Sequence, residues 1–286
     1  MRARARAKIN LTLLVRPRDR TGLHPLRSLV RSVDWEDVLD LVVDDEDRLV
    51  VVGDAAEGVP DDEANLAWRA VEEVRRVAGR QRPLTMRLDK RIPHAAGLGG
   101  GSADAAAALR LAATVLGHRG DIAASSLGAD VPFCLRGGSA WMEGYGERIT
   151  AVPLPADYAL AVVVPEMELP TPAVYGRWDQ LGGPEGEEVG RRDLPGSLRD
   201  VGPVRNDLTP AAIHLRPELG DRIADLRRRW GQPVAMTGSG SALFGFFGTR
   251  AEAAEAVAEA GPSRAARAVE PVDEGVVLVG DPPDGP

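Results

Sequence analysis

The sequence has little of three things, and each scarcity excludes a class of protein. With one cysteine, Cys134, the chain cannot form an intramolecular disulfide, which fits a reducing cytoplasm. No segment approaches the ~20 consecutive apolar residues of a membrane-spanning helix. Positively charged residues are also few: the chain has 35 Lys and Arg against 43 Asp and Glu, and the formal net charge of −8 argues against a nucleic-acid-binding surface. We therefore expect a cytoplasmic protein whose partners are small molecules, with neither a nucleic acid nor a membrane among them.

Lysine is scarcer than this total suggests, because only Lys8 and Lys90 are lysines among the 35 basic residues. A chain that uses arginine for nearly every surface cation is expected to keep lysine where a compact ammonium group is needed. Each lysine could still be an ordinary solvated residue. Their rarity nevertheless makes both of them candidates for a functional site.

The chain length and the order of the expected elements predict two α+β domains. At 286 residues the chain exceeds the usual size of a single-core domain and suggests two domains that share a cleft. We place the N-terminal domain at residues 1–155 and the C-terminal domain at 156–286, with the boundary near Pro153–Tyr158. The basic start, followed by the apolar run Ile9–Val15, is interpreted as a first strand. A targeting peptide is disfavoured because this run is short and no small-residue cleavage site follows it.

Apolar periodicity and turn residues predict the individual elements. Strands are expected at Lys8–Val15, Val38–Val43, Arg48–Val52, Leu84–Leu88, Ser139–Met142, Arg148–Val152, Ala159–Val164, Ala265–Val269 and Val276–Val279, with a strand–turn–strand unit at Val234–Phe247. Helices are expected at Asn65–Val77, Ala103–Leu116, Asp121–Leu127, Asp207–Leu215, Pro217–Trp230 and Ala251–Ala260. The segment Gly182–Pro203 is predicted to be a long loop and Asp281–Pro286 a frayed tail.

The glycine-rich segment Pro93–Ser102 lies between an expected strand and the alanine-rich helix. Glycines let the backbone adopt positive φ and approach a ligand closely, so that successive N–H groups can point at one anion. The helix that follows adds its unpaired N-terminal donors and its dipole. Ser102 is suited either to cap that helix or to reach a Mg²⁺ ion bound to phosphate. We therefore interpret this segment as a phosphate-binding turn.

Other interpretations of the turn fit less well. A Walker P-loop requires Gly-Lys-Ser/Thr at its end, which is missing here. A dinucleotide fingerprint requires glycine where Ser102 stands and an acidic strand end ~20 residues later, and the sequence has neither. A purely structural loop would hardly need four glycines between Gly97 and Gly101.

The turn resembles the signature Pro-x-x-x-Gly-Leu-Gly-small-small-Ser of the GHMP kinase superfamily. Further blocks along the chain are similar to one branch of this superfamily, which phosphorylates a cytidine diphosphate-linked methylerythritol. Any one block is weak, but they occur in the family's order and cover nearly the whole chain. These blocks are Ala7–Leu11, Gly22–Leu26, Leu127–Phe133, Glu143–Glu147, Pro170–Pro172, Asn206–Leu208 and Thr237–Ser241.

The resemblance implies a two-domain kinase with its active site in the cleft between the domains and with ATP and Mg²⁺ as cofactors. It implies that Asp130 is the general base for the substrate hydroxyl. Lys8 corresponds to the catalytic lysine of the family, whose positive charge would keep Asp130 ionised. Without the surrounding motif, Asp130 would read as an ordinary helix cap or turn residue. We expect the nucleotide to be bound by Lys90, Pro93, His94, Ala95, Ala96, Gly97, Leu98, Gly99, Gly100, Gly101, Ser102 and Ala103. Ser102 is the candidate Mg²⁺ ligand, and Asp104 a second residue that could assist.

The same resemblance assigns the acceptor side of the cleft. It implies that Asn10 bonds the hydroxyl end of the acceptor, that His24 reads the cytosine edge and that Tyr175 stacks on the base. A second glycine turn, formed by Gly238, Ser239 and Gly240, is expected to bracket the diphosphate. As isolated residues, these would read as a polar strand residue, a surface His, a core Tyr and a tight hairpin.

One position departs from the family pattern, because Leu23 stands where the family usually has Tyr beside the histidine. One aromatic face of the expected base site is therefore replaced by an aliphatic side chain.

Three other functions stay open at this point: a GHMP kinase for another alcohol such as homoserine or a mevalonate derivative, a nucleotide-binding homologue without turnover, and, more remotely, a dinucleotide oxidoreductase.

Overall fold

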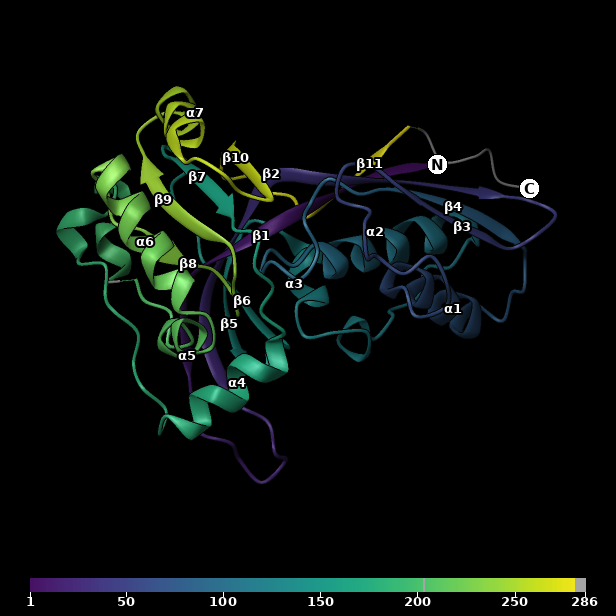
Figure 1. Ribbon diagram of the computed structural model, residues 1–286. Coiled ribbons are helices and arrows are strands. Elements are labelled where there is room, and N and C mark those ends of the chain that lie inside the picture. The colour runs from purple at the N-terminus through teal and green to yellow at the C-terminus, as the bar shows by residue number, and fades with distance from the viewer. Residues whose placement is uncertain (203, 281–286) are drawn as a thin grey trace.

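The computed structural model describes residues 1–202 and 204–280, so the expected tail at 281–286 lies outside the described residues. The described chain forms two sheets with helices packed on them, which confirms the predicted α+β class (Figure 1). No helix in the described ranges is both long and apolar enough to cross a membrane.

The first sheet has seven strands in the order β11-β1-β2-β4-β3, with β5 added to β2 and β6 to β5. All pairs are antiparallel except β3 with β4. The long strand β2 pairs with β5 through its first half and with β4 through its second half. The strands are β1 (Arg2–Val15), β2 (Leu26–Val43), β3 (Arg48–Val52), β4 (Leu84–Asp89), β5 (Ser139–Gly144), β6 (Arg148–Ala151) and β11 (Val276–Val279).

Three helices, α1 (Leu66–Ala78), α2 (Gly100–Val115) and α3 (Val131–Arg136), pack with this sheet. The period-2 pattern of β1 explains why one face is covered, since Ala3 and Ala5 are fully buried while Arg4 between them is exposed. Helix α2 is buried on nearly all sides because it lies against both the sheet and α1, and its many alanines permit that close approach.

The second sheet has four antiparallel strands in the order β10-β7-β9-β8. Its strands are β7 (Ala159–Val164), β8 (Ala235–Met236), β9 (Leu243–Phe247) and β10 (Ala265–Val269), and its helices are α4 (Thr171–Gln180), α5 (Thr209–Leu215), α6 (Pro217–Trp230) and α7 (Arg250–Glu259). Three short 3₁₀ helices are η1 (Ala124–Ser126), η2 (Arg191–Asp193) and η3 (Gly196–Val201). Over its described residues, 182–202, the segment expected to be a loop holds only the last two of these and one side of an isolated bridge, at Val189.

A shared apolar core joins the two sheets. It contains Ile9 and Leu29 of the first sheet together with Leu160 and Phe244 of the second. Apart from β11, which returns to pair with β1, the strands before residue 155 are in the first sheet and those after it in the second. The division at 155/156 stays a prediction.

Two expectations about elements were wrong or incomplete. The helix expected over Asp121–Leu127 is only the single 3₁₀ turn η1. Helix α2 begins at Gly100 rather than Ala103, so the last glycines of the predicted turn form its first helical turn. The sequence patterns also did not predict α3, α4 or the first half of β2.

The two glycine turns, one from each sheet, touch backbone to backbone. Gly97 has φ +80°, and a Cβ added to it would lie 2.3 Å from the carbonyl oxygen of Thr237. Gly238 has φ +59°, and a Cβ added to it would lie 2.8 Å from the carbonyl oxygen of Gly97. The N–H of Ala242 donates to the carbonyl of Ala96 at 3.0 Å. This contact allows no side chain at either glycine.

The contact predicts opposite effects for two neighbouring glycines. Gly97→Ala is expected to lower the free energy of unfolding by more than about 2 kcal/mol, because the left-handed conformation alone costs an alanine roughly 1–2 kcal/mol and the collision adds to it. Gly101→Ala is the matched control, since Gly101 is helical and nothing lies within 4 Å of its added Cβ. It is expected to keep or raise stability by up to about 1 kcal/mol. Urea unfolding of both variants measures this, and equal stabilities would contradict the contact.

Candidate active site

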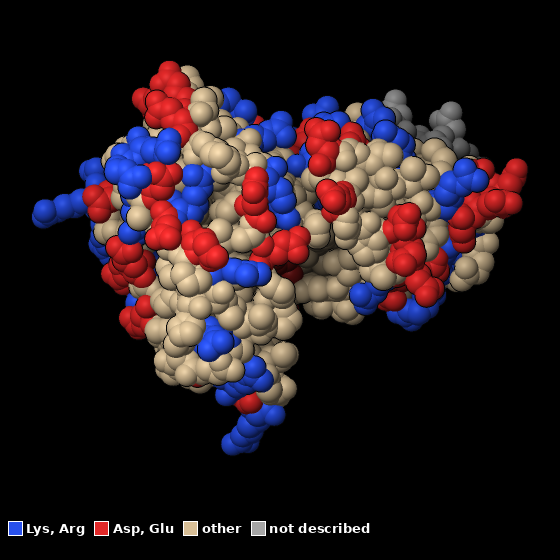
Figure 2. Space-filling model, viewed as in Figure 1, with Lys and Arg blue, Asp and Glu red and all other residues tan. Residues whose placement is uncertain are grey.

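A cavity of about 790 Å³ lies between the two halves of the chain. Figure 2 shows the surface hollowed between the lobe with α4 and the lobe with α1–α3, while acidic and basic residues are interspersed elsewhere on this face. The predicted residues that line the cavity are Lys8, Asn10, His24, Pro93, His94, Ala95, Ala96, Gly97, Leu98, Gly99, Gly100, Gly101, Ser102, Asp130, Tyr175, Gly238 and Ser239. Sequence positions far apart are therefore brought to one site.

The first glycine turn forms one wall of the cavity. Ala95, Gly97 and Gly99 have φ between +52° and +80°, the left-handed conformation that the glycine content predicted for two of them. Helix α2 starts directly after the turn, and its N-cap Gly99 offers no side chain to bond the first N–H groups. Gly100, Gly101 and Ser102 of the first helical turn line the cavity. The free donors of a 16-residue helix thus border this space, as anion binding requires.

Lys8 and Asp130 form an ion pair inside the cavity. The Lys8 ammonium lies 3.3 Å from Oδ2 of Asp130, and the Lys8 side chain is only 5% exposed, whereas that of Asp130 is 31% exposed. Asp130 precedes α3 at its N-cap position, but its side chain makes no capping bond to any residue that the structure describes. The helix-cap interpretation therefore does not hold, and the carboxylate is left to face the cavity.

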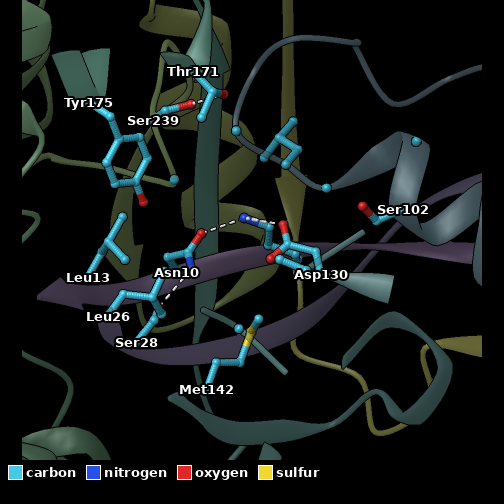
Figure 3. A pocket seen from close by; sticks show the side chains of 18 of the residues that line it. Asn10, Leu13, Leu26, Ser28, Ser102, Asp130, Met142, Thr171, Tyr175 and Ser239 are labelled. Carbon is cyan, nitrogen blue, oxygen red and sulfur yellow. Dashed lines mark hydrogen bonds and ion pairs between the residues drawn. The ribbon is translucent and has the colours of Figure 1, made fainter. Parts of the chain in front are cut away.

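A chain of hydrogen bonds fixes the lysine from below (Figure 3). Lys8 donates to Oδ1 of Asn10 at 2.5 Å, and Asn10 donates through Nδ2 to the hydroxyl of Ser28 at 2.7 Å. The Ser28 hydroxyl in turn donates to the carbonyl of Thr12 at 2.6 Å. Gly99 covers the lysine from above, because a Cβ on Gly99 would lie 2.8 Å from Cγ of Lys8. The ammonium group is thus held between the strand and the turn.

His24 and Tyr175 come together from different parts of the chain. The ring centroids are 5.2 Å apart, and Trp178 of the same helix meets the histidine edge-on at 5.4 Å. Burial raises the pKa of Tyr175 to about 12, so its hydroxyl stays protonated at neutral pH. In Figure 3, Tyr175 lies on one side of Asn10 and Asp130, and Ser102 on the other. The cavity therefore has two ends, one aromatic and one glycine-rich.

The hydrogen bonds of His24 define which ring nitrogen carries the hydrogen. Nδ1 lies 2.9 Å from the carbonyl oxygen of Arg16, which can only accept. Nε2 receives the Nε–H of Arg18 at 3.2 Å, and the same group also donates to Asp179. Nδ1 therefore carries a hydrogen, and Nε2 accepts from Arg18, with the Asp179 carboxylate 3.4 Å away.

Lys90 is not where the sequence placed it. Its side chain is 1% exposed and does not line the cavity, because it lies beneath the glycine turn between the carboxylates of Asp37 and Asp104. The expectation that it borders the nucleotide is therefore wrong. Asp104 is also buried, which removes it as a metal ligand. Ala103 is fully buried and Gly240 does not line the cavity either.

Several cavity residues were not predicted. They are Leu13, Arg18, Leu26, Ser28, Met142, Tyr145 and Thr171. Leu26, Tyr145 and Thr171 lie within blocks that resemble the family and could have been found from those blocks. Arg18 and Met142 lie outside every block. Leu13 and Ser28 carry no signal in the sequence, because only the pairing of β1 with β2 brings them together.

No group of three or more His, Cys, Asp or Glu residues within the described ranges is arranged to hold a metal ion. A Mg²⁺ ion bound to nucleotide phosphates needs few protein ligands, because it keeps several waters and takes oxygens from the phosphates. Ser102, at the start of α2 and on the cavity wall, fits that limited demand.

Comparisons with known proteins agree with this geometry. The family model described as the GHMP kinases N terminal domain matches residues 65–138. A 4-diphosphocytidyl-2-C-methyl-D-erythritol kinase of Cutibacterium acnes is 39% identical over 255 residues, covering 83% of this chain and 82% of the relative. The enzyme of the same name from Dinoroseobacter shibae is 40% identical over 269 residues, covering 89% and 88%.

Solved structures give the same result. A crystal structure of 4-(cytidine 5'-diphospho)-2C-methyl-D-erythritol kinase is 32% identical, with a TM-score of 0.75 and coverage of 95% of this chain and 99% of that one. Homoserine kinase from Cytophaga hutchinsonii, with a TM-score of 0.70 and 18% identity over 98% and 97% of the chains, shares the fold. The chain therefore belongs to the GHMP kinases, in the family of the 4-diphosphocytidyl-2-C-methyl-D-erythritol kinases.

Proposed function

We propose that this protein transfers the γ-phosphoryl group of ATP to the 2-hydroxyl group of 4-diphosphocytidyl-2-C-methyl-D-erythritol, in the non-mevalonate route to isoprenoid precursors. The observation that carries the proposal is the Lys8–Asp130 pair, which faces the glycine turn within one cavity. The reaction is placed in the cytoplasm, in line with the free, buried Cys134.

The nucleotide end of the cavity is the glycine turn. Its backbone N–H groups and the N-terminus of α2 receive the phosphates of ATP, and these donors are already directed by the left-handed residues. The hydroxyl of Ser102 would hold Mg²⁺, and the ion would supply neutralisation of charge on the phosphates.

Phosphoryl transfer takes place between the turn and the ion pair. Asp130 aligns the acceptor hydroxyl and takes up the proton that it loses, the hydroxyl oxygen forms a bond to the γ-phosphorus, and the bond to the ADP oxygen breaks. Lys8 holds Asp130 in place and stabilises the negative charge on the transferred group. Asn10 orients the lysine and bonds the acceptor near its reacting hydroxyl.

The aromatic end of the cavity receives the cytosine base. Tyr175 provides the stacking surface, while Leu23, 55% exposed, covers the base from the loop in place of a second ring. Nε2 of His24, which accepts from Arg18 in this structure, exchanges that partner for the amino group of cytosine, also a donor, and opposes the carbonyl that uracil has there. Gly238 and Ser239 bracket the diphosphate between the two ends.

The ion pair predicts the effect of removing either partner. Asp130→Asn and Lys8→Met are expected to lower kcat by about 10²–10⁴-fold, because the proton acceptor or its counter-charge is lost while the turn is unchanged. Mg²⁺-dependent ADP release in the presence of the acceptor measures this. Asp45→Asn, an exposed carboxylate without an ion pair among the described residues, is the control and should leave kcat unchanged. Near-normal turnover in folded Asp130→Asn would refute the assignment of the base.

The histidine predicts which acceptors are used. With the cytidine diphosphate-linked acceptor we expect ADP release, and with its uridine analogue we expect kcat/KM to fall roughly 100-fold or more, because a lone pair then faces a carbonyl. Homoserine and mevalonate serve as the other acceptors in the panel. Equal use of the uridine analogue would contradict the role of His24, and a higher kcat/KM with homoserine or mevalonate would contradict the proposed acceptor.

Base stacking predicts that two substitutions of Tyr175 affect the KM for the acceptor differently. Tyr175→Ala is expected to raise the KM for the acceptor about 10- to 100-fold, since base stacking is worth about 1–3 kcal/mol. Tyr175→Phe keeps the ring and should change this KM little. Steady-state kinetics at saturating ATP distinguishes them, and similar losses in both variants would assign the contribution to the hydroxyl instead.

A further inference from the structure

The second lysine of the chain lies in a buried cluster of charges beneath the glycine turn. Lys90 Nζ is 2.5 Å from Oδ2 of Asp37 and 2.7 Å from Oδ2 of Asp104. The three side chains are 1%, 0% and 4% exposed. They come from the residue after β4, from β2 and from α2, so the cluster ties together the elements on both sides of the turn.

Each member of the cluster contacts the turn or an element that flanks it. Oδ1 of Asp37 accepts the N–H groups of Arg91 at 2.5 Å and Ile92 at 2.8 Å, the residues that lead into the turn. The Lys90 ammonium lies under Gly100, where an added Cβ would be 3.3 Å away from it. Asp104 belongs to the start of α2, the helix that leaves the turn.

Lys90 keeps its positive charge within the cluster. Burial opposes the charge of Lys90, but the two carboxyl groups outweigh this effect and raise its pKa, so it stays protonated. Burial raises the pKa of Asp104 well above its usual range, and its Oδ1 has no hydrogen-bond partner among the described residues. Asp37 is held by two backbone N–H groups as well as by the lysine.

We propose that Lys90 is a positioning residue which, with Asp37 and Asp104, holds the glycine turn in its phosphate-binding conformation before ATP arrives. It touches no substrate and acts through the backbone of residues 91–100. The inference rests on the proposed function, since it takes the turn to be the phosphate site. Preorganised N–H groups need no reordering when the nucleotide binds, which is why the cluster sets the affinity for ATP.

The test compares variants by calorimetric titration with Mg-ATP in the absence of acceptor. Lys90→Met and Asp37→Asn are each expected to weaken ATP binding roughly 10- to 100-fold, the scale of a misplaced binding group. The double variant should bind ATP no more weakly than the weaker single variant, because both changes break one support. The KM for ATP should rise, while the KM for the acceptor stays within about threefold. Asp104→Asn should weaken ATP binding less than Asp37→Asn does, because the amide keeps an oxygen that accepts from Lys90.

Arg75→Met is the matched control for simple loss of a buried cation. Arg75 is 3% exposed and pairs with Asp47 and Glu72, but on α1, away from the turn. It should lose stability and keep wild-type affinity for ATP. Hydrogen exchange of amides 91–101 in the free proteins gives a second measurement, with faster exchange expected in Lys90→Met and not in Arg75→Met.

The outcomes separate the inference from the proposed function. Wild-type ATP affinity in folded Lys90→Met, or an equal loss in Arg75→Met, would overturn the positioning role. If Lys90→Met does not fold, Asp37→Asn and the exchange data decide by the same criteria. Absence of ATP binding by the wild-type protein would instead overturn the proposed function, and the exchange rates would still show whether the cluster holds the turn.

Discussion

The contact between two glycine turns sets the geometry of this protein. Gly97 of the first turn and Gly238 of the second approach so closely that a Cβ on either would meet backbone atoms of the other turn. Around this contact, the turn after β4 of the first sheet forms the cavity wall that is expected to bind phosphate. Helix α4, which belongs to the half of the chain with the second sheet, supplies Tyr175. The N–H of Asn10 donates to the Thr237 hydroxyl at 2.8 Å, so the strand that carries Lys8 is tied to the same point. The cavity exists because backbone packs on backbone here.

An acidic chain that binds anions must place its positive groups locally. The formal net charge is −8, yet the cavity wall consists of N–H donors at a helix start, with Lys8 and Arg18 as cations. Both lysines pack against the turn, Lys8 against Gly99 and Lys90 against Gly100. A backbone site of this kind binds phosphate through dipoles and leaves its few full charges for orientation and transfer.

The sequence predicted those parts of the molecule that local chemistry determines. The glycine turn was found from its glycines and α2 from its alanines. Lys8 was singled out by the scarcity of lysine, and the resemblance gave its role and that of Asp130. Helix α4 was missed because it starts at Pro170-Thr171-Pro172 and buries only Val174 and Trp178, which leaves little periodicity. The first half of β2 was missed because it buries Ser28, Arg31 and Ser32 among its apolar residues. The position of Lys90 could not be predicted, since its partner Asp37 is 53 residues away and pairs only in the folded sheet.

In the proposed reaction one cavity holds both substrates, with the transferred group between the glycine turn and the Lys8–Asp130 pair. A crystal structure of the protein with a non-hydrolysable ATP analogue, Mg²⁺ and the cytidine diphosphate-linked acceptor would show this arrangement. We expect the γ-phosphate at the turn, the acceptor hydroxyl within hydrogen-bond distance of Asp130 and the cytosine on Tyr175. An acceptor hydroxyl directed away from Asp130, or a nucleotide bound outside the turn, would contradict it.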